Sequence, residues 1–313
     1  MDLGLVLMVM TLISSFLVGG NNSLVALGIL FATNIIKRRY ARYIVSTSMF
    51  IGAVVGGFTM KESVSKLLLV RDSSGNIILI LLSVIISSLL IFLYLNYIGV
   101  PSSFSQMVIL PVFILGFISG IGINLQYFIL LLISWVLSPL IPYTFSPIIY
   151  KFFKNRLAIK DIIVYIRILK IIILPSSILL SIAIGGNVIG LIISLSSIIN
   201  YFSILLIIIY ALASFLGVLV FSGSAVFIGF RVARLGYVSV SSFLLSSGIV
   251  IEAFTILGIP VSIAQTMLGG LLGFSMWGSR RISKMLASWF ISPFLCTFSS
   301  LAIYTILYNL KVA

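Results

Sequence analysis

The sequence predicts an all-α polytopic membrane protein of about ten (10–12) transmembrane helices, arranged as two inverted repeats with broken helices. Three observations predict this fold class: the overall hydropathy, the spacing of apolar runs between basic tracts, and a motif order that occurs twice. Of the 313 residues, 61% are hydrophobic and 8% are charged, and the mean hydropathy is +1.34. A soluble domain carries roughly 25% charged residues, so the composition excludes a soluble protein.

The apolar runs have the length of membrane spans, since a helix needs about 20 apolar residues to cross a bilayer. Two runs are longer than one straight span and are interrupted by glycine pairs, which indicates broken helices. The expected spans are 3–36, 40–59, 77–98, 102–120, 126–148, 162–198, 202–229, 237–258, 261–278 and 285–310.

The formal net charge of +14 is concentrated in short tracts between these runs, near 37–42, 151–160, 231–234 and 280–284. Cytoplasmic loops carry such an excess of Lys and Arg, so we expect the lipid bilayer as a partner and no nucleic acid. Placing all four tracts inside the cell predicts a multi-pass protein of the cell membrane with both termini extracellular.

The residues that are absent exclude several kinds of chemistry. The chain has no histidine and a single cysteine, Cys296, so imidazole metal sites, thiolate metal cages and internal disulfides are excluded. The Ser-rich stretch at 102–105 has no histidine or lysine neighbour that could activate a nucleophile. We therefore expect no enzyme activity, no cofactor and no metal.

Three sequence motifs occur in the same order in each half. "VGGNNSLVALGILF" (18–31) is echoed by "IGGNVIGLIISL" (184–195). "GVPSSFSQMVILPVFILG" (99–116) is echoed by "GIPVSIAQTMLGGLLG" (258–273), and "SWVLSPL" (134–140) by "SWFISPF" (288–294). Because each half has an odd number of net crossings, the second half is upside down relative to the first. The expected division is a first repeat at 1–150, a basic cytoplasmic linker at 151–161 and a second repeat at 162–313. Inverted repeats with broken helices are typical of secondary transporters.

These motifs resemble the signatures of the inorganic phosphate transporter family, which also includes sulfate permeases. "GGNNSLVALG" is similar to its G-A-N-D-x-A-N-A-x-G signature. "PSSFSQ" (101–106) and "PVSIAQ" (260–265) are similar to its P-V-S-T-T-H signature, and "SWVLSP" and "SWFISP" to the helix that follows. The resemblance implies a transporter of phosphate, or in some members sulfate, driven by sodium or protons. It also implies a polar site between the repeats.

The chain departs from the family pattern at the charged positions. Asn22 stands where the signature has aspartate, and the second half keeps Asn187 but has no acidic residue there. Gln106 and Gln265 replace the signature histidine. The carboxylates that hold sodium in the family are therefore missing, so the sequence favours a proton over sodium as the coupling ion.

Polar groups at the helix breaks are the candidate anion site. A half-helix that starts at Asn22 or Ser23 presents backbone N–H groups, and the stretch "VPSSFSQ" does the same while adding hydroxyl donors. Such donors can hold an oxyanion without a formal cation. The alternative is that Gly and Ser residues serve close helix packing. The expected substrate-binding residues are Asn21, Asn22, Ser23, Ser102, Ser103, Ser105, Gln106, Asn187, Ser262, Gln265 and Thr266.

Glu252 is the acidic residue that lies clearly inside a span, and it is the candidate proton carrier. The alternative is that it lies near enough to its helix end to reach the interface. The predicted function is secondary active transport of inorganic phosphate by alternating access, coupled to protons. The alternatives are a permease for sulfate or another tetrahedral oxyanion, and an uncoupled anion facilitator or channel. A homodimer is a further candidate assembly.

Overall fold

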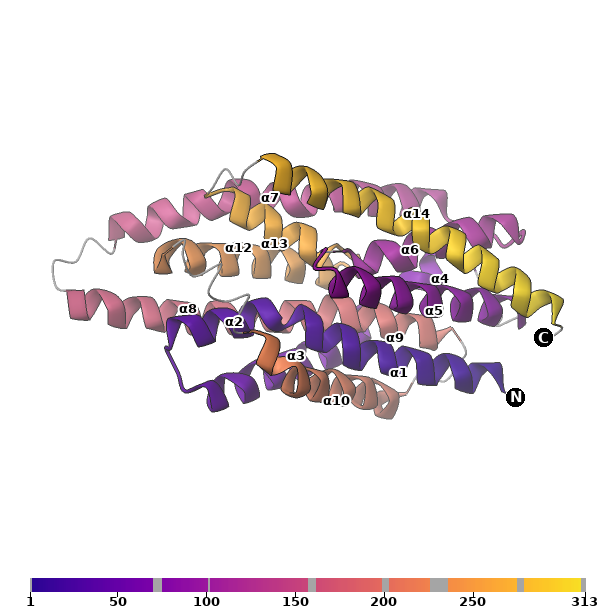
Figure 1. Cartoon of the computed structure of the whole chain (residues 1–313), viewed down its shortest axis with the longest axis horizontal. Coiled ribbons are helices and arrows are strands. Elements are labelled where there is room, and N and C mark those ends of the chain that lie inside the picture. Colours follow the sequence, from indigo (N-terminus) through magenta and orange to yellow (C-terminus); the bar gives the residue numbers. More distant parts are fainter. Residues whose placement is uncertain are drawn as a thin grey trace.

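The computed structural model describes residues 2–69, 75–100, 102–156, 162–198, 203–225, 236–274 and 279–310. Within this part of the chain the regular structure is helical, apart from one isolated bridge between Leu68 and Ile123. The long helices run roughly along the longest axis, and both termini lie at the same end of the molecule (Figure 1). The basic tract at 231–234 and residues 157–161 of the expected linker lie outside the described residues.

The first half contains one broken helix, α1 (Leu3–Asn22) and α2 (Leu24–Thr33), and a long helix with a short one after it, α3 (Arg38–Thr59) and α4 (Ser63–Leu67). It also contains a hairpin, α5 (Gly75–Tyr97) and α6 (Phe104–Ile118), and one very long helix, α7 (Leu125–Arg156). The second half contains α8 (Ile162–Ile184), η1 (Gly185–Ile189), α9 (Gly190–Ser197), α10 (Ile204–Phe221), η2 (Ser222–Ser224), α12 (Tyr237–Ile256), α13 (Ile263–Leu272) and α14 (Ser279–Asn309).

The two glycine-interrupted runs form helices with a local irregularity. In the first run, α1 ends at Asn22 and α2 begins at Leu24, so the expected half-helix starts next to the predicted position. Ser23 between them keeps a right-handed helical conformation, and its N–H donates to the Gly19 carbonyl at 3.3 Å. In the second run, residues 185–189 form a π-helix, a feature frequent at functional sites.

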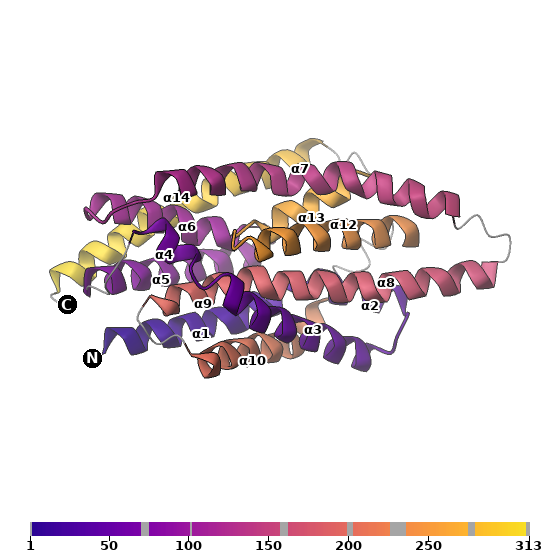
Figure 2. The ribbon, with the colours of Figure 1, turned by 180° about the vertical axis from the view of Figure 1, so that it is seen from behind.

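The helices α5 and α6 form one hairpin, and α12 and α13 form another. Residues 98–103 are the first tip and residues 257–262 the second tip. Each tip contains a glycine with positive φ, Gly99 at +72° and Gly258 at +70°, which lets the chain leave the helix in the same type of turn. The two hairpins enter from opposite ends of the molecule, and their tips meet near its middle (Figures 1 and 2).

This arrangement bears on the number of crossings. Eight helical segments among the described residues are long and apolar enough to span a membrane, whereas α6 and α13 are shorter. Both short helices are return arms of the hairpins. The expected all-helical membrane fold is confirmed, but the count of ten crossings is not, because a hairpin arm and a full span look alike in composition.

The glycine pairs bring helix backbones together. A Cβ on Gly19 or Gly20 would collide with α10, where Ser214 and Gly217 lie opposite them. In the second half, Gly186 packs against Gly56 of α3 in the same way. Small residues permit this close approach in membrane helices. Close packing, the alternative interpretation of these glycines, is therefore what the structure shows at both breaks.

Candidate functional site

The two tips present matching polar groups at the start of α6 and α13. Ser103 is the N-cap of α6, and its hydroxyl accepts the Gln106 N–H at 3.4 Å. Ser262 is the N-cap of α13, and its hydroxyl accepts the Gln265 N–H at 3.3 Å. Serine is a favoured N-cap because its oxygen satisfies a free N–H of the first turn.

The glutamines that replace the family histidine contact each other across the tips. Gln106 Nε2 donates to Gln265 Oε1 at 3.2 Å, and Gln265 Nε2 donates to Gln106 Oε1 at 3.0 Å. Both side chains are nearly buried. Each amide nitrogen carries two hydrogens, so this reciprocal pair leaves one N–H on each glutamine.

The hydroxyl groups nearby differ in what their hydrogens do. Ser105 donates to the Val261 carbonyl at 2.9 Å, and Thr266 donates to the Ser262 carbonyl at 2.8 Å. The hydroxyl of Ser102 is buried and has no hydrogen-bond partner in the part of the chain that the structure describes. Neither tip sequence contains a charged residue. The polar groups of the tips are therefore electrically neutral.

Asn187 ties the π-helix to the second tip. Its Nδ2 donates to Thr255 Oγ1 at 3.0 Å and to the Ile259 carbonyl at 3.1 Å, and its Oδ1 accepts the Val261 N–H at 3.0 Å. Asn187 is fully buried. Two of its bonds reach the backbone of the second tip and the third reaches the end of α12, so Asn187 positions this loop.

Asn21 occupies the equivalent position in the first half. Its Nδ2 donates to Asn96 Oδ1 at 3.3 Å, and Asn96 is placed in α5 as Thr255 is placed in α12. The two asparagines of the repeated Gly-Gly-Asn sequence therefore each contact the end of a hairpin arm.

The remaining candidates, Ser23, Asn22 and Glu252, make no hydrogen bond to the described residues of either tip. Ser23 is buried, and its hydroxyl donates to the Gly20 carbonyl at 2.8 Å, within its own helix. Asn22 lies beside it at the helix break and is half-buried. Glu252 lies one turn before Thr255 on α12, half-buried, and its Oε2 has no hydrogen-bond partner among the described residues. Glu252, the proton carrier expected from the sequence, therefore lies in α12 and outside the two tips.

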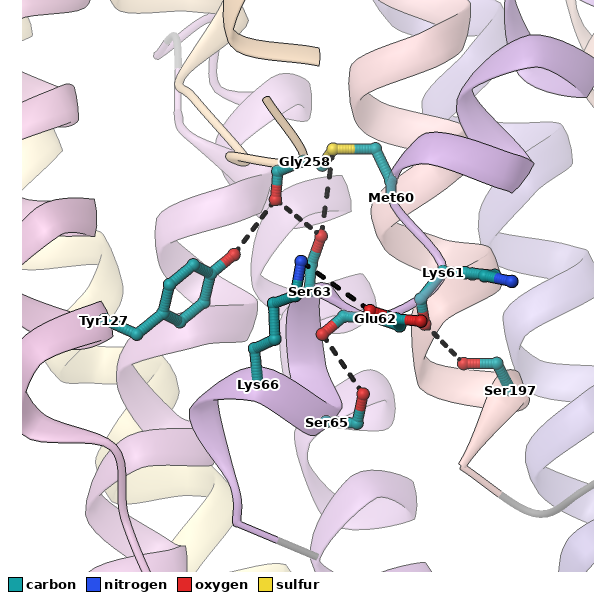
Figure 3. A network of polar contacts seen from close by, with 9 residues as sticks. All are labelled: Met60, Lys61, Glu62, Ser63, Ser65, Lys66, Tyr127, Ser197 and Gly258. Atoms are coloured by element: carbon teal, nitrogen blue, oxygen red, sulfur yellow. Dashed lines mark hydrogen bonds and ion pairs between the residues drawn. The ribbon is translucent and has the colours of Figure 1, made fainter. Parts of the chain in front are cut away.

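Sequence reasoning missed three residues that hold the second tip. Ser63 Oγ and Tyr127 Oη donate to the Gly258 carbonyl at 2.9 and 3.0 Å, as Figure 3 shows. Trp135 Nε1 donates to the Pro260 carbonyl at 3.2 Å. Of these, Trp135 lies in a repeated motif, which is a signal that could have been used. Ser63 and Tyr127 lie in no repeated motif.

Two opposed hairpins with polar tips inside a bundle of apolar helices define the class of secondary membrane transporters. Comparison with known proteins agrees with this class. Residues 18–184 match the profile described as the phosphate transporter family. The chain belongs to this family, and so it belongs among multi-pass membrane transporters rather than enzymes.

Two individual proteins are similar over most of the chain. A protein of Methanocaldococcus jannaschii that carries the provisional name phosphate permease is 27% identical over 266 residues, covering 83% of this chain and 81% of its own. A solved structure titled "The sodium-dependent phosphate transporter" superposes with a TM-score of 0.88 at 16% identity, covering 99% of this chain and 100% of that chain. The second likeness establishes the shared fold.

Proposed function

We propose that the protein transports inorganic phosphate across the cell membrane by alternating access, with the anion bound between the two tips. The observation that carries this proposal is the set of neutral donors at the tips. Gln106 and Gln265, in the first turns of two helices, each keep one amide hydrogen outside their reciprocal pair, and the hydroxyl of Ser102 beside the first of these helices has no partner among the described residues. Helix N-termini and hydroxyl groups suit an oxyanion.

The two halves, 1–150 and 162–313, are proposed to be inverted repeats. During alternating access each repeat takes up the conformation that the other had before. The matched N-caps, the matched glycine turns and the equivalent contacts of Asn21 and Asn187 support this division. α7 extends to Arg156, so the proposed linker begins inside this helix. The basic tracts place the termini outside the cell in this proposal.

The coupling ion has two candidates. We propose the proton, carried by Glu252, because Asn22 replaces the signature aspartate and because a carboxylate oxygen of Glu252 is buried without a partner among the described residues. The similar solved structure is of a sodium-dependent protein, and this makes sodium the rival candidate. A hard cation gains much of its attraction from carboxylate ligands, and neither tip provides one.

Uptake by proteoliposomes tests both the proposed substrate and the proposed coupling ion. Labelled phosphate and labelled sulfate are offered separately, with a sodium gradient, a proton gradient or neither imposed. Phosphate uptake that exceeds sulfate uptake supports the proposed substrate, and the reverse result favours the alternative sulfate permease. Uptake of phosphate and sulfate that is equal, and that neither gradient changes, supports an uncoupled facilitator.

A further inference from the structure

The second tip is held by side chains from several elements of the protein. Each of four consecutive carbonyls, from residue 258 to residue 261, accepts a hydrogen bond from a side chain outside its own hairpin. The donors are Ser63 and Tyr127 to Gly258, Asn187 to Ile259, Trp135 to Pro260 and Ser105 to Val261.

Trp135 has a counterpart in the second half with no such bond. The repeated sequences "SWVLSP" and "SWFISP" place Trp289 at the position equivalent to Trp135. Trp289 is buried, and its Nε1 has no hydrogen-bond partner in the part of the chain that the structure describes. A buried indole N–H without an acceptor is unfavourable, and such a group in a native protein calls for an explanation.

Trp289 lies on α14 before the residues that bond to α6, on the side of the first tip. Cys296 on α14 donates to the Met107 carbonyl of α6 at 3.0 Å, and Ser119 after α6 donates to Tyr304 of α14 at 3.3 Å. The two helices therefore run side by side in the same direction. Trp289 lies seven residues, about two turns, before Cys296, and the first tip ends at Ser103, four residues before Met107.

We propose that Trp135 and Trp289 hold the two hairpin tips in turn, one in each conformation of the transport cycle. In the conformation described here, Trp135 donates to the second tip and the Trp289 indole donates to no described residue. In the opposite-facing conformation, Trp289 donates to a carbonyl of the first tip while the bond between Trp135 and Pro260 is broken. Both residues position the tips and do not contact the anion. The inference rests on the proposed alternating-access transport of phosphate.

The test uses Trp135→Phe and Trp289→Phe, since phenylalanine keeps an aromatic ring and removes the N–H. The KM for phosphate is measured on each face of the membrane in oriented proteoliposomes. The less populated conformation opens to one face, and the apparent affinity there is proportional to its population. Losing one hydrogen bond corresponds to about a fivefold change in population. On that face we expect the KM to fall about fivefold in Trp135→Phe and to rise about fivefold in Trp289→Phe.

The double variant is expected to return close to the wild-type KM, and Tyr97→Phe, at a side chain that is 89% exposed, is the matched control. If the KM shifts in the same direction in both single variants, or in neither, the proposal that the two tryptophans hold the tips in turn is overturned. If Trp135→Phe fails to insert, Tyr127→Phe removes another bond to the second tip and gives the same test. Failure of the wild-type protein to take up phosphate would instead contradict the proposed function.

Discussion

The side-chain amides of Gln106 and Gln265 hydrogen-bond to each other in both directions and thereby join the first turns of α6 and α13. In the proposed site the anion binds beside this pair. The pair also differs from the histidine of the family signature, because an amide is neutral at every pH and offers both donors and an acceptor. The first prediction follows from this contact.

Replacing Gln106 or Gln265 by alanine is expected to raise the KM for phosphate about tenfold or more. Each change removes an amide donor, and a hydrogen bond to a charged group contributes about 1.5–3 kcal/mol. Initial rates of labelled phosphate uptake measure the KM. Gln126→Ala changes an exposed glutamine at the start of α7 and is the control.

Asn22→Ala is expected to raise the KM as well, by a smaller factor, because Asn22 lies at the helix break and is only half-buried. The comparison separates the two proposed parts of the site. An unchanged KM in the Gln106 and Asn22 variants, with normal insertion, would remove both residues from the anion site.

Asn187 is predicted to matter more for stability than its counterpart Asn21. Asn187→Ala removes three buried hydrogen bonds and leaves two backbone groups of the second tip unpaired, whereas Asn21→Ala removes one longer bond. We expect a loss of about 2–4 kcal/mol in the first variant and of about 1 kcal/mol or less in the second. Unfolding in mixed detergent micelles measures both. Equal losses would contradict the assigned role of Asn187.

Much of the fold follows from composition, yet the hairpins do not. The stretches 102–120 and 261–278 have the apolar length of full spans, but α6 ends at Ile118 and α13 at Leu272. Hydropathy reports which residues avoid water, and a hairpin arm packed inside the bundle avoids water as a full span does. The meeting of the two tips is therefore a tertiary feature that single segments do not encode.

The candidate site also has features that the sequence predicts and tertiary features that it does not. Repeated polar residues such as Ser103 and Ser262 could be found because side chains identify N-caps in a sequence. The acceptors of Tyr127 and Trp135 are backbone carbonyls, which every residue has. No sequence pattern could therefore show that the second tip is held through its main chain.

Close helix packing at Gly56 predicts a strong effect of a single methyl group. In Gly56→Ala the added Cβ would overlap the backbone of Gly186, which cannot move without shifting the π-helix. Overpacking of this kind costs about 1–3 kcal/mol or more. Gly75→Ala is the matched control, because a Cβ there meets open space. We expect a lower yield of folded protein for Gly56→Ala alone, measured by size-exclusion chromatography in detergent.

The inverted arrangement predicts that positions 37 and 280 lie on the same side of the membrane. Single cysteines at these positions, in a Cys296→Ser background, are to be labelled in intact cells with a reagent that cannot cross the membrane. Both should react only after the cytoplasmic side is opened. Labelling of one position and not the other from the same side would contradict the proposed topology.

The last prediction concerns coupling through Glu252. Inside the span it is an acidic side chain that can bind and release a proton, and its Oε2 makes no hydrogen bond within the described part of the chain. If the proton enters with phosphate, uptake should rise as the external pH falls and should not depend on sodium. Glu252→Gln keeps the shape but cannot exchange a proton, so the response to a pH gradient should disappear while exchange of anion for anion survives. Glu62→Gln, which changes an exposed carboxylate paired with Lys66 at 3.7 Å, should leave the response unchanged. Sodium-dependent uptake in the parent protein, or a normal gradient response in Glu252→Gln, would assign coupling to another ion or another group.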